Sequence, residues 1–485
     1  MAIAATSIAS LPELNTTIAT LQLARTNLLK ASNWTHESST QLPGYVASLA
    51  FRDCDKLYDE SETRLSRLVS AEITYTADDA LTWLSGVLAN HRTCLEGLAE
   101  KGLVEGPQLA QYFVHSQKLK ASLGEALASY SNKKETSKEK RLMPRRPGQK
   151  SNPSTNGGVL VSWNPATSKA DFVVAMDGSG THKTINDAVS ALARMGHGRP
   201  QRAIIYVKSG VYNEKVEIEG NLRNVMFVGD GMSKTIVTSN RNVPDGATTL
   251  SSATFGVSGD GFWARDITFE NTAGPQKHQA VALRVSSDQA VFYRCGIRGY
   301  QDTLYAHSLR QFYRDCHIYG TIDFIFGDAP AVLQSCDIFV RRPMAHQANM
   351  ITAQGRDNPN ENTGISIHNS RVRAAHEFES VKSSFRTYLG RPWKKYSRTV
   401  FLKTDLDGLV DPKGWTEWRG DFAVKTLFYG EYMNTGRGAS TARRVSWPGF
   451  HVLNSPQQAS PFTVGSFIQG GSWIPDTGVP FTLGV

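Results

Sequence analysis

The chain has 485 residues, of which 40% are apolar and 20% charged, a balance typical of a soluble globular protein. This length predicts two domains, since one core rarely grows beyond about 250–300 residues. No run of about 18 apolar residues occurs, so no membrane insertion is predicted. The first residues, MAIAATSIASLPELN, lack a basic start and a continuous apolar run, so no signal peptide is predicted there.

The net charge of +9 is concentrated in one segment. Eight Lys or Arg and two Glu lie between Lys133 and Lys150, which gives +6 and leaves about +3 (9 − 6) for the remainder. A pI near 9.2 would suggest nucleic-acid binding, but most of the excess charge lies in this one segment. A cationic tether that attracts an acidic polymer fits this distribution as well, and no nucleic-acid partner is predicted.

The first 130 residues predict an all-α four-helix bundle. Thr76 is expected to cap the third helix, with Asp78 and Asp79 in its first turn, where the helix dipole favours anions. Apolar residues recur at helical spacing in four segments, which are Leu11–Leu29, Tyr45–Val69, Ala80–Leu98 and Leu109–Tyr130.

Residues 131–160 have a different composition. They are charged, rich in Pro, Gly and Ser, and nearly free of large apolar side chains, so they predict a basic disordered linker. Arg141-Leu142-Met143 resembles a site that a processing protease would cut, although the segment could equally be a solvated linker. The third part of the chain is residues 161–485.

Five cysteines occur, which fits two disulfides and one free thiol in an oxidising compartment, or five buried thiols. Cys54 and Cys94 lie on the second and third expected helices and could join them. Two N-x-[ST] sequons, at Asn15 and Asn33, also favour a secreted glycoprotein.

The remainder of the chain is mainly β and contains a repeat of about 20 residues. The pattern Cys-x-Ile recurs at Cys295, Cys316 and Cys336, which are 21 and 20 residues apart. Such a period predicts a solenoid, and the Leu/Asn signature of a leucine-rich repeat is absent, so we expect a right-handed parallel β-helix. Equivalent positions in neighbouring coils then stack about 4.8 Å apart. Cys316 would lie within disulfide reach of both Cys295 and Cys336, and spacing alone does not decide between them.

The same period brings polar residues together. Gln279, Gln301 and Asp323 are separated by 22 and 22 residues, and Asp302 precedes Asp323 by 21. Paired carboxylates suit acid/base or nucleophilic chemistry, and nearby amides could stabilise an oxyanion. The alternative is a ladder of stacked polar residues without a catalytic role.

The sequences around these positions resemble the plant pectin methylesterases from about Thr167 to the C-terminus. Five motifs carry the resemblance: Gly210-Val-Tyr-Asn-Glu214, Gln279-Ala-Val-Ala-Leu283, Gly299-Tyr-Gln-Asp-Thr-Leu304, Asp323-Phe-Ile-Phe-Gly327 and Leu389-Gly-Arg-Pro-Trp393. The N-terminal helices resemble the pectin methylesterase inhibitor pro-domain. They carry two cysteines where that domain usually has four, which puts their inhibitory competence in question.

The resemblance implies a role for each matching residue. Asp323 would be the nucleophile on the C6 methyl-ester carbonyl of galacturonate, and Asp302 the acid and then the base. Gln279 and Gln301 would stabilise the tetrahedral intermediate, and Arg391 would hydrogen-bond Asp323 and keep it ionised.

Further implications concern the substrate and the cysteines. Trp393 and Thr249 would contact the polysaccharide, and Cys316 would pair with Cys336. The implied partners are pectin, a protease acting at the linker and proteinaceous inhibitors. The implied location is the plant cell wall, and the implied role of the bundle is to cover the site until cleavage.

Other functions fit the residues less well. The absence of a G-x-S-x-G motif disfavours a serine esterase, and the scattered histidines disfavour a zinc hydrolase, so no metal or cofactor is expected. A β-helix lyase would generally need several carboxylates around calcium, but glutamines stand beside Asp302 and Asp323. A β-helix glycosidase and an inactive pectin-binding protein are the remaining alternatives.

Overall fold

The computed structural model describes residues 11–41, 45–103, 110–140 and 158–485, and the chain divides into two compact units, Met1–Gly148 and Gln149–Val485. The expected processing site at residues 141–143 lies outside the described residues. None of the helices in the described ranges is long and apolar enough to cross a membrane.

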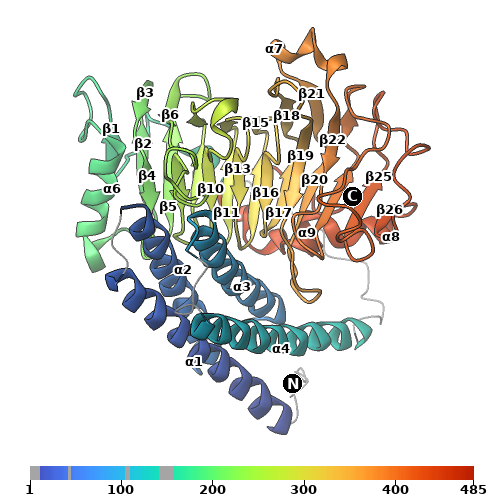
Figure 1. Ribbon diagram of the computed structural model, residues 1–485. Helices are drawn as coiled ribbons and strands as arrows, with labels where there is room; N and C mark the ends of the chain where they lie inside the picture. The colour runs from blue at the N-terminus through green and yellow to red at the C-terminus, as the bar shows by residue number, and fades with distance from the viewer. Residues whose placement is uncertain (1–10, 42–44, 104–109, 141–157) are drawn as a thin grey trace, which may run out of the picture. The chain divides into compact units, whose positions relative to one another are not determined.

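Four helices form the first unit, as their apolar spacing predicts (Figure 1). The Thr76 side chain accepts a hydrogen bond from the Asp79 N–H while Asp79 bonds back to Thr76, which makes a capping box. Cys54 and Cys94 form the expected disulfide between the second and third helices. The helices are α1 (Leu11–Gln41), α2 (Tyr45–Val69), α3 (Ala77–Glu100) and α4 (Ala110–Lys140).

Helix α4 differs from the expectation at its end. It continues to Lys140, ten residues into the segment expected to be a disordered linker, so that boundary is wrong for residues 131–140. Lys133 donates a hydrogen bond to Thr17 Oγ1 at 3.0 Å, and Lys134 pairs with Asp78. Contacts with α1 and α3 therefore extend a helix that composition alone does not predict.

Residues 158–485 form a parallel β-helix with three sheets, as the repeat predicts (Figure 1). The 11-stranded sheet contains β1 (Phe172–Val174), β2 (Ala203–Val207), β5 (Val225–Gly229), β8 (Trp263–Arg265), β11 (Ala290–Tyr293), β14 (Gln311–Arg314), β17 (Pro330–Gln334), β20 (Gly364–His368), β23 (Arg398–Leu402), β25 (Phe428–Tyr432) and β26 (Phe450–Val452). The 7-stranded sheet contains β4 (Val216–Ile218), β7 (Phe255–Val257), β10 (Leu283–Val285), β13 (Leu304–Ala306), β16 (Ile325–Gly327), β19 (Asn349–Gln354) and β22 (Thr387–Gly390). The 8-stranded sheet contains β3 (Gly210–Asn213), β6 (Thr235–Ser239), β9 (Thr268–Asn271), β12 (Gly296–Arg298), β15 (His317–Gly320), β18 (Asp337–Val340), β21 (Arg371–Ala374) and β24 (Asp405–Leu406).

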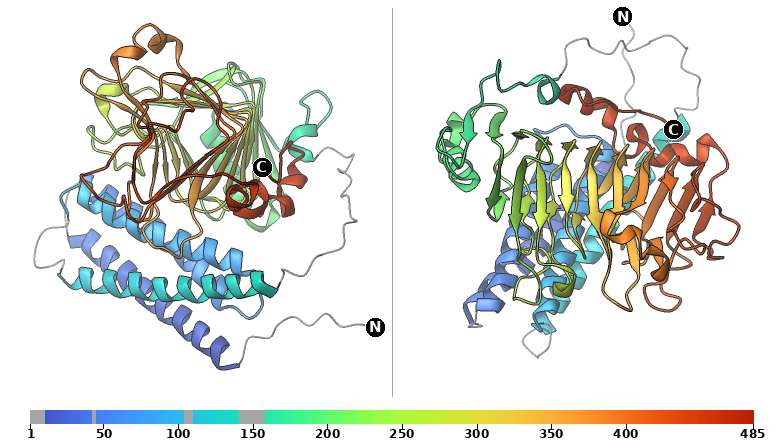
Figure 2. Two further views of the ribbon diagram at one scale, coloured as in Figure 1. Left: turned by 90° about the vertical axis from the view of Figure 1, so that its right-hand side faces the viewer. Right: turned by 90° about the horizontal axis from the view of Figure 1, so that it is seen from above.

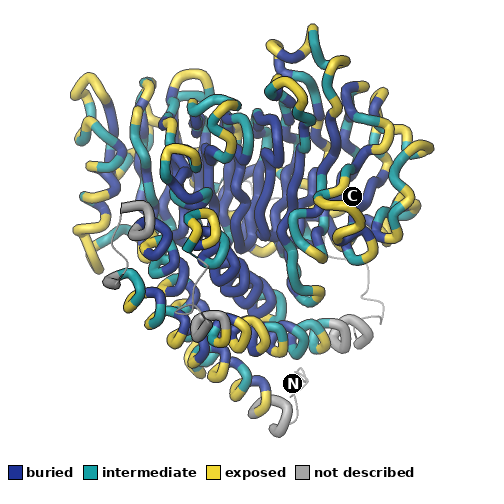
Figure 3. Tube along the Cα trace, in the orientation of Figure 1, coloured by how far each residue is buried: buried dark blue, intermediate teal, exposed yellow. Residues whose placement is uncertain are grey.

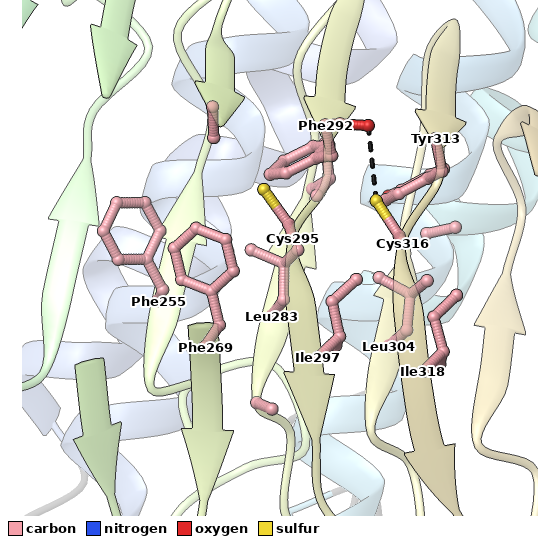
Figure 4. Close-up of a cluster of buried hydrophobic side chains, with 14 of the residues drawn as sticks. Phe255, Phe269, Leu283, Phe292, Cys295, Ile297, Leu304, Tyr313, Cys316 and Ile318 are labelled. Atoms are coloured by element: carbon pink, nitrogen blue, oxygen red, sulfur yellow. Dashed lines mark hydrogen bonds between the residues drawn. The ribbon is translucent and has the colours of Figure 1, made fainter. Parts of the chain in front are cut away.

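Each repeat of the sequence corresponds to one coil, and the coils stack side by side (Figure 2). Ile297 pairs with Ile318, which pairs with Ile338, so the Cys-x-Ile pattern marks equivalent strands. Phe292 pairs with Tyr313, and their rings stack with centroids 5.1 Å apart inside the coil (Figure 4). The strands are buried along most of their length (Figure 3). This apolar interior holds the turns of neighbouring coils in fixed register.

Helices cover only parts of this unit. Helix α6 (Ile185–Arg194) lies against the first coils, and the Glu214 carboxylate accepts hydrogen bonds from the N–H groups of Ile185 and Asn186 at 2.8 and 2.9 Å. Glu214, the last residue of the first motif, therefore has a structural role at this helix terminus. The shorter helices are α5 (Val159–Ser162), α7 (His376–Glu379), α8 (Pro456–Ala459) and α9 (Val464–Phe467).

The expected disulfide between Cys316 and Cys336 is wrong, because Cys295, Cys316 and Cys336 are all free, buried thiols. Each stands at the equivalent position just before β12, β15 or β18. Cys316 Sγ donates to the carbonyl oxygen of Phe292 at 3.3 Å (Figure 4), and Cys336 Sγ to that of Tyr313 at 3.6 Å. The Cys316 and Cys336 thiols thus bond to backbone carbonyls of the preceding coil, and the Cys295 thiol bonds to the Tyr293 carbonyl of its own coil.

Candidate active site

Asp302 and Asp323 occupy equivalent turns in neighbouring coils. Each precedes its strand by two residues, and Leu304 of β13 pairs with Ile325 of β16. Both have left-handed backbone conformations, with φ of 63° and 51°, which Asp adopts more readily than most residues. The Asp302 N–H donates to the Ile322 carbonyl oxygen at 3.0 Å. The 21-residue spacing therefore places the two aspartates on one edge of the 7-stranded sheet.

Arg391 reaches Asp323 from two coils away. It follows β22, whose Gly390 pairs with Thr352, which in turn pairs with Ile325. A Cβ atom at Gly390 would lie 2.1 Å from Thr352 Oγ1, so glycine permits this close strand approach. Arg391 Nε donates to Asp323 Oδ1 at 2.9 Å, and its terminal nitrogen donates to Oδ2 at 2.6 Å. This two-point contact fixes the orientation of the carboxylate.

Two opposing effects act on the Asp323 carboxyl, which is 5% exposed. Burial raises its pKa, whereas the hydrogen bonds and positive charge of Arg391 lower it, and the net direction is upward. Burial lowers the pKa of Arg391, but the hydrogen bonds and charge of Asp323, together with the charge of Asp302, raise it, and the net direction is upward. Arg391 thus reduces the free-energy cost of ionising the buried Asp323 carboxyl but does not eliminate this cost.

Gln301 and Gln279 lie in neighbouring segments before β13 and β10. Gln301 directly precedes Asp302, and its carbonyl oxygen accepts a hydrogen bond from the Ala280 N–H, next to Gln279, at 3.3 Å. Both side chains are half-buried. Among the described residues, neither side-chain amide has a hydrogen-bond partner, so their N–H groups can donate to a bound oxyanion.

An aromatic row lies beside the carboxylates. Tyr305 and Phe326 each follow one aspartate by three residues, and their rings stack 4.2 Å apart at 14°. Trp393 meets Phe326 at a centroid distance of 5.9 Å with the rings inclined at 64°. A Cβ at Gly355 would lie 2.8 Å from the Trp393 ring, so glycine is needed for this placement. Tyr305 and Phe326 are buried and Trp393 is half-buried, so Trp393 is the ring of this row that can meet the apolar face of a sugar.

Thr249 lies in a turn of the coil that precedes Gln279. Its carbonyl oxygen accepts the Ser252 hydroxyl at 2.8 Å, and Ser252 Oγ accepts the Val281 N–H at 3.1 Å. The Thr249 turn is therefore attached to the strand segment that follows Gln279.

Sequence reasoning did not identify Trp418. The Arg391 guanidinium carbon lies 4.3 Å from the centroid of the Trp418 ring, so this ring covers the cation that holds Asp323. Trp418 belongs to the run GWTEWR, which lies outside the repeating coil pattern, and only its aromatic richness could have drawn attention to it.

Comparisons with known proteins address the same residues. A family model described as Pectinesterase matches residues 171–471, and one described as Plant invertase/pectin methylesterase inhibitor matches residues 4–131. The chain is 60% identical to "Probable pectinesterase/pectinesterase inhibitor 36" of Arabidopsis thaliana, over 96% of this chain and 94% of that protein. The chain belongs to the pectinesterase family.

Two further pectinesterases extend the comparison. "Pectinesterase 2" of Citrus sinensis is 49% identical over 96% of this chain and 88% of its own. The solved structure "Pectin methylesterase from Carrot" is 54% identical, with a TM-score of 0.64, and the match covers 66% of this chain and 99% of that one. The pectinesterase match contains every residue of the site described above.

Proposed function

We propose that this pectinesterase hydrolyses the C6 methyl esters of pectin, with Asp323 as the nucleophile and Asp302 as the general acid and base. The observation that carries this assignment is the stacked aspartate pair, of which one member is held at two points by Arg391. One oriented carboxylate beside a second carboxylate supplies a nucleophile and a proton-transfer group.

The reaction divides between these groups as follows. Asp323 attacks the ester carbonyl carbon, and the side-chain amides of Gln279 and Gln301 donate to the resulting oxyanion. Asp302 gives its proton to the departing methanol, which leaves an acyl-enzyme. Asp302 then removes a proton from water, which attacks the acyl group, releases the free carboxylate of the polymer and restores Asp323.

Substrate binding is assigned to the surroundings of the pair. Trp393, supported by Phe326, presents a ring to the sugar chain, and Thr249 contacts it near Gln279. The acidic product would also be attracted by the net positive charge of the chain.

The remaining assignments concern the whole chain. The bundle of residues 1–130 acts as an inhibitory pro-region, and a protease cuts the basic linker and frees the pectinesterase domain of residues 161–485. Other proteinaceous inhibitors are potential partners. The Cys54–Cys94 disulfide supports secretion to the cell wall.

Methanol release and product analysis test the activity. Highly methylated pectin would be incubated with the intact chain and with residues 158–485, while methanol and unsaturated chain ends are measured. The proposal predicts methanol without unsaturated ends or chain shortening. Unsaturated ends would instead identify a lyase, shortening without them a glycosidase, and bound but unaltered pectin a binding protein.

A further inference from the structure

Arg341 connects the two segments that lead to the aspartates. It directly follows β18, and its N–H donates to the carbonyl oxygen of Gly320, the last residue of β15 before the turn that carries Asp323, at 2.8 Å. The strand register places Arg341 two coils from Tyr300, or about 10 Å along the axis. Its side chain spans that distance and reaches the turn that leads to Asp302.

Four contacts with three residues hold this side chain in place. One terminal nitrogen donates to the Gly299 carbonyl oxygen at 3.1 Å, and the other donates to the Tyr300 hydroxyl at 2.8 Å. The guanidinium carbon lies 3.9 Å from the centroid of the Tyr300 ring. At the outer end, Nε bonds to the carboxylate of Glu377 in α7 at 2.7 Å. The planar guanidinium can make all of these contacts at once, whereas a lysine ammonium could not.

The contacts fix the backbone that immediately precedes the acid/base residue. Gly299 and Tyr300 are three and two residues before Asp302, and the Tyr300 carbonyl oxygen also accepts the Thr321 N–H of the nucleophile turn at 2.9 Å. Arg341 is thus bonded to the turn that leads to Asp302 and to the end of the strand that leads to Asp323. A displacement of about 1 Å in a reacting group can reduce a rate about a hundredfold.

We propose that Arg341 is a positioning residue for the esterase reaction, which sets the placement of Asp302 relative to Asp323 through Gly299 and Tyr300. This inference rests on the proposed function. Arg341 does not enter the chemistry itself, and its contribution is the geometry of the turn. Its loss should therefore lower kcat and leave substrate affinity nearly unchanged.

The test compares Arg341→Gln with Arg371→Gln. Both variants are made in whichever form of the parent sequence releases methanol, the intact chain or residues 158–485. Arg371 is a matched control because it makes a two-point pair with Asp337 in the same sheet and does not contact either turn. Arg341→Gln is expected to lower kcat at least about tenfold with KM within about twofold, and the control to leave both within about twofold. Arg341→Lys should recover only part of the loss.

The alternatives give different results. Equal kcat in Arg341→Gln and the control, a loss confined to KM, or full recovery with lysine would each overturn the inference. Thermal unfolding shows whether Arg341→Gln folds. If it does not, the test uses Tyr300→Phe, which removes one hydrogen-bond acceptor of Arg341 and is expected to lower kcat about threefold. An unchanged kcat in Tyr300→Phe would overturn the inference. An inactive parent in both preparations would overturn the proposed function as well.

Discussion

At the scale of single residues, Asp323 combines two requirements that conflict. A nucleophilic carboxylate must be ionised, but a side chain that is 5% exposed is costly to ionise. Arg391 reduces this cost by binding both oxygens. The Trp418 ring over Arg391 restricts that cation further. In the proposed mechanism, the reactivity of the site therefore depends on Arg391, which lies two coils away from Asp323.

Replacing Arg391 tests this dependence. In Arg391→Gln the charge that lowers the Asp323 pKa is lost while burial remains, so the pKa rises further. The acidic limb of the kcat/KM profile should move to higher pH, and kcat should fall at least about tenfold at every pH. Arg294→Gln, which removes a comparable two-point pair with Asp266, is the control. An acidic limb that stays in place would contradict this account.

The cysteines give a second residue-scale prediction. Alkylation of the unfolded chain without a reductant should modify Cys295, Cys316 and Cys336, and mass spectrometry of the peptides should find Cys54 and Cys94 modified only after reduction. Protection of Cys316 and Cys336 before reduction would show that they are joined.

At the scale of elements, the sequence predicts most where a pattern repeats. The Cys-x-Ile period marks one coil, and the 21-residue spacing of Asp302 and Asp323 equals the register of β13 and β16. Gln279 departs from that register, because it precedes Gln301 by 22 residues, whereas Leu283 and Leu304 pair at a spacing of 21. The turn before β10 is longer, and turn lengths do not follow the repeat.

Other elements depend on contacts that are distant in sequence. The last turns of α4 are stabilised by contacts of Lys133 and Lys134 with other helices. The charged composition of this segment does not predict these contacts. Arg341 reaches Tyr300 across 41 residues. Trp418 also lies outside any repeat, so its place against Arg391 could not be predicted from spacing.

Helix α3 carries a buried histidine that makes the bundle sensitive to acid. His91 is 1% exposed, lies between the Tyr58 hydroxyl and Ser116 Oγ at 2.9 Å each, and burial lowers its pKa to about 4. In the unfolded chain the pKa of His91 is about 6.5. The stability that neutral His91 contributes is therefore complete above pH 6.5, decreases as the pH falls, and is lost as the pH falls through about 4. The loss approaches about 3 kcal/mol.

Urea titrations followed by the helical circular dichroism signal at pH 7 and pH 4 measure this effect. His91→Gln should reduce the difference in unfolding free energy between the two pH values. His36→Gln, whose side chain is 76% exposed, should leave it unchanged. Equal pH dependence in both variants would contradict the role of His91.

At the scale of the whole molecule, the chain consists of two compact units joined by a segment with a high positive charge. The second unit has its own continuous core, and it matches nearly all of the carrot enzyme. A tethered inhibitor acts at an effective concentration of about millimolar, so cutting the tether and diluting weakens even a modest inhibitor.

Cleavage within residues 141–157 tests the inhibitory role. A recognition sequence for a specific protease would be introduced there, and methanol release would be measured before and after cleavage and dilution. The proposal predicts a rise of at least about tenfold per molecule. A rate that does not change would show that the bundle does not inhibit the esterase.

The most direct test of the central claim is the rate of methanol release by Asp323→Asn in the active preparation. Asparagine keeps the shape and the left-handed backbone but cannot act as the nucleophile. Asp315→Asn is the control, because Asp315 has the same φ of 51° in the turn between β14 and β15. The account predicts a loss of at least about a thousandfold for Asp323→Asn and full activity for the control. If Asp323→Asn kept more than about a tenth of the parent rate, Asp323 would not be the nucleophile.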